Sequence, residues 1–158
     1  MTHGWLPLLA PVLGLAAVVS LLRLRPGGAH EGYLGSSYDD IGHAVMNASM
    51  AVMLWRGAMA GSVWSVWPVA VVLVAVALLA SRRGVWGPWV TVAQCVVMAY
   101  AAGGSMARGV ALPGLALVLV VLLALDAALT AVLAVPMSVA FPHLAMDVAL
   151  VAMLIAAL

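Results

Sequence analysis

The stretch PGLALVLVVLLALDAALTAVLAV, residues 113–135, contains a single charged residue, Asp126, in an almost entirely apolar run. It is long enough to cross the hydrocarbon core of a bilayer, which takes about 20 residues of α-helix. Prolines at Pro113 and Pro136 indicate where this helix begins and ends. A carboxylate inside a membrane is costly, so we expect Asp126 to face the bundle interior, protonated or with a local partner such as Thr130.

The rest of the chain has the same apolar character. Of its 158 residues, 67% are hydrophobic and 7% are charged, and the mean hydropathy is +1.24. A soluble domain of this size could not bury so much apolar surface, and backbone groups in lipid must be hydrogen-bonded within their own segment. We therefore predict an all-α integral membrane bundle. The chain has no lysine and one cysteine, Cys95, which excludes Schiff-base chemistry, an internal disulfide and a thiolate metal cluster.

Six apolar segments predict about six transmembrane helices in a single domain, residues 1–158. Their approximate ranges are 5–22, 41–55, 63–80, 89–102, 113–135 and 143–158. Four arginines fall on one side of this arrangement and two on the other: Arg23, Arg25, Arg82 and Arg83 against Arg56 and Arg108. By the positive-inside rule, we expect a multi-pass protein of the cell membrane with both termini outside.

Two of these segments repeat one pattern, HAVMNASMAVML at 43–54 and HLAMDVALVAML at 143–154. Each begins with His, has Met three residues later and an amide or carboxylate one residue further on, and closes on Met-Leu. At about 100° per residue, these positions form one stripe along a helix. The stripes are His43, Met46, Met50 and Met53 in the first copy, and His143, Met146 and Met153 in the second, with Leu150 in the middle position. We expect both His to begin helices that start from the same side, so that the two clusters face each other at one depth.

A third, weaker copy lies in TVAQCVVMAYAA, residues 91–102, where Met98 aligns with the middle Met. These residues resemble an uncharacterised family of bacterial multi-pass membrane proteins, common in actinobacteria, that repeat H-x-x-M-x-x-x-M-x-x-M across several helices. The resemblance covers the whole chain and implies a membrane fold without an established activity. Thr91 and Gln94 depart from the family pattern, because they stand where His and the first Met would be.

Imidazole and thioether together form a soft ligand set that suits Cu(I) better than hard cations. A His at a helix N-terminus also favours the neutral imidazole that binds metal. The ten Met run against a composition typical of GC-rich coding sequence, since the only Met codon is GC-poor. We therefore predict a membrane protein that binds a soft metal ion for transport, storage or delivery. Cu(I) is the ion that suits the ligand set best. The predicted ligands are His43, Met46, Met50, Met53, His143, Met146 and Met153, with Asn47, Asp126 and Asp147 as orienting or proton-binding neighbours.

Three other interpretations stay open at this level. The Met stripes suit packing seams of a structural or assembly subunit, because Met is an adaptable core residue. The two His suit the axial ligands of a b-type haem. Asp39 and Asp40 suit capping of the second helix or attraction of cations to a mouth. We find no nucleophile–base pair, phosphate loop or nucleotide fingerprint, so we expect no enzyme. The expected partners are the lipid bilayer and a second copy or another membrane subunit, not nucleic acid.

Overall fold

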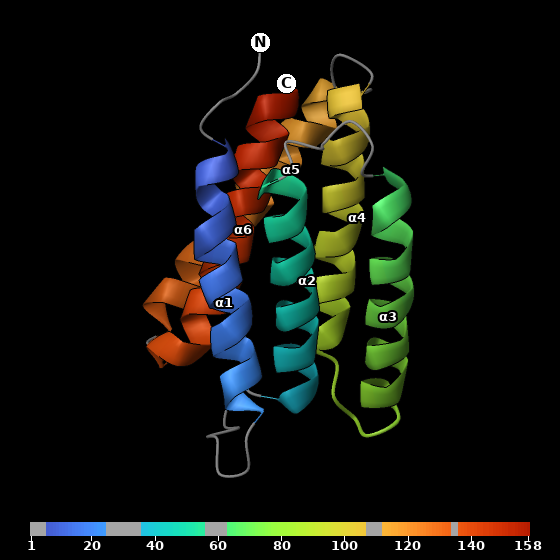
Figure 1. Cartoon of the computed structure of the whole chain (residues 1–158), viewed down its shortest axis with the longest axis vertical. Coiled ribbons are helices and arrows are strands. Elements are labelled where there is room, and N and C mark those ends of the chain that lie inside the picture. Colours follow the sequence, from blue (N-terminus) through green and yellow to red (C-terminus); the bar gives the residue numbers. More distant parts are fainter. Residues whose placement is uncertain (1–5, 25–35, 56–62, 107–111, 134–135) are drawn as a thin grey trace.

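The computed structural model describes residues 6–24, 36–55, 63–106, 112–133 and 136–158 (Figure 1). Within these ranges it contains six α-helices, one 3-10 helix and no strand, so the all-α prediction is confirmed. The elements are η1 Leu6–Leu9, α1 Ala10–Arg23, α2 Ser37–Trp55, α3 Val63–Ser81, α4 Pro88–Met106, α5 Pro113–Val132 and α6 Met137–Ala157.

The largest boundary difference concerns α6, which begins at Met137 and not at His143. Pro142 therefore lies inside the helix, where it lacks the N–H that would bond the carbonyl of Ser138. The Arg23 side chain replaces this donor, since its Nη1 lies 3.1 Å from the Ser138 oxygen. His43 and His143 each lie six residues after the first residue of their helix. The expectation that a helix N-terminus acts on these two rings was therefore wrong.

Three helical segments are long and apolar enough to cross a membrane: Leu6–Arg23, Pro113–Val132 and Met137–Ala157. Shorter apolar helical stretches occupy Val66–Ser81 and Pro88–Ala102. Of the described helices, α2 falls outside both groups, and it carries several buried polar side chains. The chain thus has the helical, apolar character of a membrane protein, and α2 is the most polar of its described helices.

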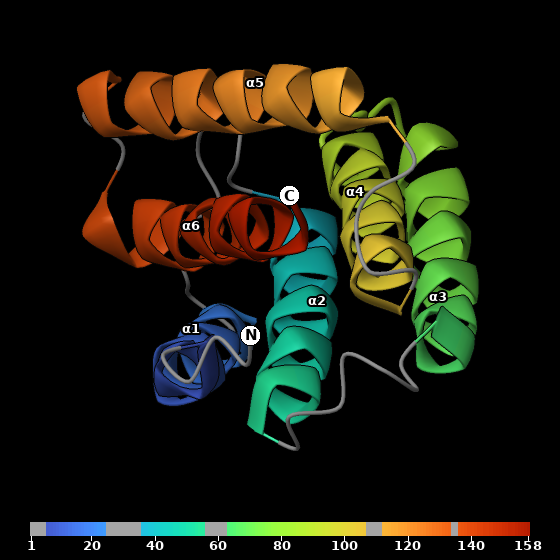
Figure 2. The same cartoon turned by 90° about the horizontal axis from the view of Figure 1, so that it is seen from above.

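Two helices, α2 and α6, lie at the centre of the bundle. Seen from above, α6 lies between α5 on one side and α1 and α2 on the other, while α3 and α4 both pack against α2 (Figure 2). The start of α1, the end of α2 and the end of α6 lie at the same end of the bundle (Figure 1). The two copies of the repeated pattern are therefore brought together by the central pair of helices.

The apolar core is rich in Met. Its Met side chains come from α2, α4 and α6 and are at most 6% exposed: Met46, Met50, Met53, Met98, Met146 and Met153. Gly42 allows α2 and α4 to approach closely, because a Cβ there would lie 3.3 Å from Thr91 Oγ1. The outward side of α5 presents large aliphatic side chains such as Leu117, Val121 and Leu125, as a lipid-facing helix does.

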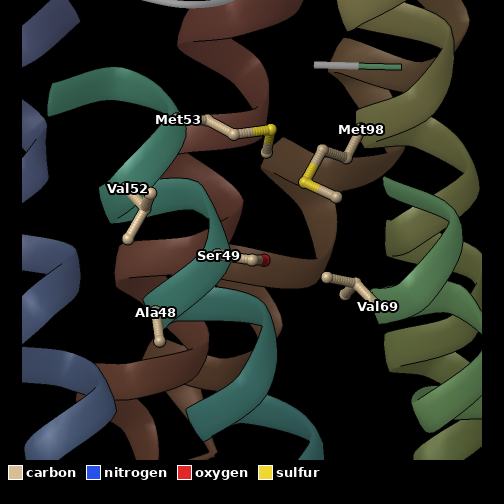
Figure 3. Close-up of a pocket in the computed structure, with 6 residues that line it drawn as sticks. All are labelled: Ala48, Ser49, Val52, Met53, Val69 and Met98. Atoms are coloured by element: carbon tan, nitrogen blue, oxygen red, sulfur yellow. The ribbon is translucent and has the colours of Figure 1, made fainter. Parts of the chain in front are cut away.

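A pocket of about 300 Å³ opens between α2, α3 and α4 (Figure 3). Its lining is almost entirely apolar and consists of Ala48, Ser49, Val52, Met53, Val69 and Met98. The thioethers of Met53 and Met98 extend toward the same space from α2 and α4 (Figure 3).

Candidate functional site

The two His of the repeat contact each other in the middle of the bundle. His43 Nε2 on α2 lies 3.1 Å from His143 Nδ1 on α6, and the rings meet edge to face with centroids 5.2 Å apart. Both side chains are buried. The prediction that the two copies face each other at one depth is confirmed, although both rings lie deeper in their helices than expected.

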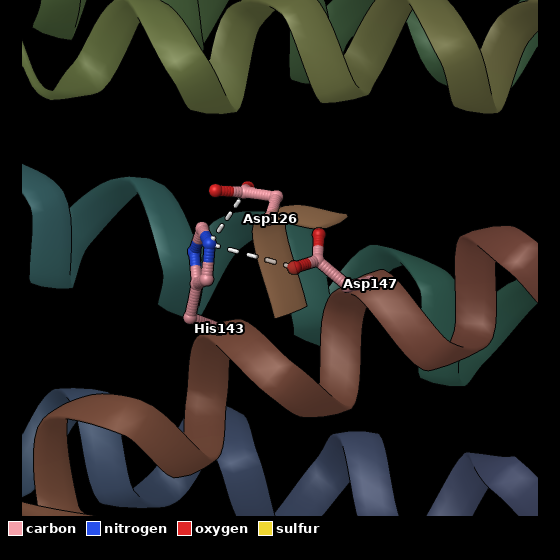
Figure 4. A group of neighbouring side chains, drawn as sticks. All are labelled: Asp126, His143 and Asp147. Atoms are coloured by element: carbon pink, nitrogen blue, oxygen red, sulfur yellow. Dashed lines mark hydrogen bonds and ion pairs between the residues drawn. The ribbon is translucent and has the colours of Figure 1, made fainter. Parts of the chain in front are cut away.

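Two carboxylates flank the second His on its far side (Figure 4). His143 Nε2 lies 3.0 Å from Asp126 Oδ2 on α5 and 3.5 Å from Asp147 Oδ2, one turn further along α6. Asp147 is fully buried, whereas the Asp126 side chain is 39% exposed. The expectation that Asp126 faces the interior is thus only partly met, and the partner it finds is His143 from the neighbouring helix in place of Thr130.

A fourth helix joins this cluster through Gln94, whose Nε2 donates to Asp147 Oδ1 at 2.7 Å. Gln94 was singled out only as a departure from the third copy of the repeat. The signal that could have identified it is its alignment with Met46 and Met146, a polar residue at an inward-facing position. Side chains from four helices thus form one polar cluster, which consists of His43, His143, Asp126, Asp147 and Gln94.

One proton arrangement satisfies both ring contacts of His143. If His43 Nε2–H donates to His143 Nδ1, then His143 Nε2–H can donate to Asp126. The donors then all point from α2 toward the carboxylates. Rings held in this way have a defined orientation, because each nitrogen that contacts another helix has a fixed role.

Asn47 has a different role from the one expected of it. Its Nδ2 donates to the backbone carbonyl of Pro142 at 3.1 Å, so it ties α2 to α6 immediately before His143. Its Oδ1, like Gln94 Oε1 and Asp147 Oδ2, is buried without a hydrogen-bond partner among the described residues. Such atoms are uncommon in folded proteins, and each of these three oxygens can still accept a hydrogen bond.

Asp39 and Asp40 lie in the first turn of α2, below His43. The Asp39 backbone N–H donates to Ser36 Oγ, and the Ser36 backbone N–H donates to Asp39 Oδ2, a reciprocal cap of the helix. Asp40 Oδ1 lies 3.4 Å from Arg23 Nε. The capping interpretation is confirmed for Asp39, while Asp40 forms an ion pair that joins α1 to α2.

The predicted thioether ligands lie at very different distances from the His pair. Met46 and Met146 each follow their His by three residues, which is one helical turn. Met50 lies seven residues from His43, and Met53 and Met153 lie ten residues from their respective His, which is roughly 10 to 15 Å along the helix axis. The structure therefore brings both His and both Asp into one cluster, but it separates the Met side chains into a column that leads away from it.

No protein-family model matches the chain, and comparisons with curated proteins and with solved structures also find no match. The resemblance based on the H-x-x-M repeats therefore stays a prediction.

Proposed function

We propose that this chain is a membrane protein that binds one soft metal ion between α2 and α6, and that Cu(I) is the ion this site prefers. The observation that carries the proposal is the buried contact of 3.1 Å between His43 Nε2 and His143 Nδ1. Two nitrogens bound tetrahedrally at about 2.0 to 2.1 Å from one ion would be roughly 3.4 Å apart. An ion held by both nitrogens would displace the proton that the two rings share, and the rings would turn so that both lone pairs face the ion.

The carboxylates suit a role in orienting the His143 ring. A His that binds metal commonly donates its other N–H to a carboxylate, which fixes the tautomer and strengthens the ligand nitrogen. Asp126 is placed to accept from His143 Nε2–H, which leaves the Nδ1 lone pair directed at His43. Asp147, held by Gln94, adds negative charge on the same side. This charge favours a cation in surroundings where water does not screen it.

The softness of the ligand set comes from Met46 and Met146, which lie one turn from the two His and are fully buried. With two imidazoles they make an N₂S₂ set that suits Cu(I). Met50, Met53 and Met153 are too far along the helices to share that ion, so we assign them to a path for the ion. Transport or delivery uses such a path, and storage does not require one.

A second candidate rests on the opposite side of the His143 ring. One oxygen each of Asp126 and Asp147 and one nitrogen of His143 all lie within 4.8 Å of one another. Two carboxylates and one imidazole suit a harder ion such as Mn²⁺ or Zn²⁺. The haem alternative is less compatible with this arrangement, because rings in direct hydrogen-bond contact leave no space for a porphyrin between them.

The test is a titration of the detergent-purified protein with Cu(I) against a competing chelator. We expect one tightly bound ion per chain, lost in the His43→Ala/His143→Ala variant and weakened in Met46→Leu/Met146→Leu. Met137→Leu is the matched control, because Met137 is 73% exposed.

Two outcomes would contradict the copper proposal. Absence of tight Cu(I) binding from the wild type, or tight binding that persists in the double His variant, would contradict a site at His43 and His143. Binding of Mn²⁺ or Zn²⁺ but not Cu(I), lost in Asp126→Asn/Asp147→Asn, would favour the second candidate.

A further inference from the structure

The pocket between α2, α3 and α4 offers two sulfur ligands and little else. Its lining has no charged side chain and no side-chain nitrogen. The Ser49 hydroxyl donates to the Met46 carbonyl at 2.8 Å, so its proton is already used. Met53 and Met98 are both buried, and their thioethers enter the pocket from two different helices (Figure 3).

The chemistry of this lining selects against most ligands. A hard cation such as Mg²⁺ or Ca²⁺ needs several oxygen ligands, and the pocket lacks them. An anion finds no donor from a basic side chain there. Two thioethers in an apolar lining suit a soft monovalent ion with a low coordination number.

The pocket lies at one end of a column of buried Met side chains on α2. From Met53, two residues before the helix ends, the column passes to Met50 and Met46 and then to His43. Each step is three or four residues, roughly 4.5 to 6 Å along the axis. All four side chains are buried on the same face of the helix. The pocket is thus the point at which this column opens, close to the end of α2.

We propose that the pocket is a loading site where a soft monovalent ion binds weakly through Met53 and Met98 before it moves along the Met column to the His pair. The onward transfer rests on the proposed function, whereas binding at the pocket does not. Met98 thereby gains a role as the second ligand, supplied by the third copy of the repeat. Each transfer exchanges one thioether ligand for the next, so no oxidant or reductant is involved.

The experiment uses Ag(I), a soft ion that does not change oxidation state under these conditions, with the full-length protein in detergent. Equilibrium dialysis gives the number of ions bound, and stopped-flow competition gives the rate at which the His pair fills. The variants are Met53→Leu/Met98→Leu and His43→Ala/His143→Ala, with the exposed Met137→Leu as control. Because Met and Leu have similar volumes, we expect the Leu variants to fold, and circular dichroism checks this.

We expect wild type to bind one tight and one weaker ion. The His variant should keep the weaker ion, and Met53→Leu/Met98→Leu should lose it and fill the His pair at least tenfold more slowly, with its final affinity unchanged. Should the double variant fail to fold, Met98→Leu alone should lose the weaker ion.

A wild-type rate and stoichiometry in the folded Met53→Leu/Met98→Leu variant would overturn the loading site. If the wild type bound the weaker ion but not the tight one, the proposed function would be contradicted. A weaker ion that remains in the His variant and depends on Met98 would still support the pocket in that case.

Discussion

The two copies of the repeat, on α2 and α6, share a sequence pattern but differ in their surroundings. His43 and His143 occupy the same position in their helices and contact each other. At the next polar position, α2 has Asn47, which donates to a backbone carbonyl, whereas α6 has Asp147, which accepts from Gln94. The comparison teaches that α2 places a neutral amide one turn from its His, whereas α6 places a carboxylate there.

The largest expected loss of stability comes from replacing the two His, and comparing the two losses tests this asymmetry. His143→Ala removes the ring that contacts His43 and both carboxylates, so it leaves several polar groups without this partner and should cost about 3 kcal/mol of unfolding free energy. His43→Ala removes one ring contact and should cost about 1 to 3 kcal/mol. Unfolding in mixed detergent micelles measures both. Equal losses would mean that the two copies are energetically equivalent.

Replacing Asn47 by Asp and Asp147 by Asn should affect the stability of the protein unequally. Asn47→Asp removes the donor to Pro142 and brings a carboxylate against a carbonyl, so it should cost about 2 to 3 kcal/mol at neutral pH. This loss should diminish in acid, because the protonated carboxyl can donate again. Asp147→Asn keeps an oxygen for Gln94 and should change stability by less than about 1 kcal/mol. It should nevertheless weaken Cu(I) binding by about 10- to 100-fold.

The stability measurement over pH 5 to 8 and the chelator titration separate these two variants. If Asp147→Asn destabilised the protein as much as Asn47→Asp, the carboxylate would be a structural residue.

The smallest effect concerns a feature that α6 has and α2 lacks, the internal Pro142. Arg23→Met removes the side chain that bonds Ser138 and pairs with Asp40, at a cost of about 2 kcal/mol. Pro142→Ala restores the backbone N–H for Ser138, so part of that cost should disappear in the double variant. A double-mutant cycle should give a coupling of about 1 kcal/mol. Additive single and double variants would mean that Arg23 does not replace the missing backbone donor.

Much of the fold followed from the sequence, because apolar runs and prolines mark membrane helices directly. The pairing of α2 with α6 also followed, since a repeat at His43 and His143 predicts equal depth. The alignment of Gln94 with Met46 and Met146 could have identified it as inward-facing, but its partner could not be predicted, because Asp147 is 53 residues away and no local pattern joins them. The start of α6 was misplaced for a related reason. Pro142 normally indicates a helix boundary, and the side chain that allows it inside the helix, Arg23, comes from α1.

The weak hydropathy of α2 has a consequence for the order in which the chain enters the membrane. This helix is synthesised before α6, yet the partners of His43 and Asn47 belong to α6. Its polar face therefore lacks those contacts while the intervening helices are made. We therefore expect stable packing of α2 to await α6, so that the two helices reach their final places in one cooperative step.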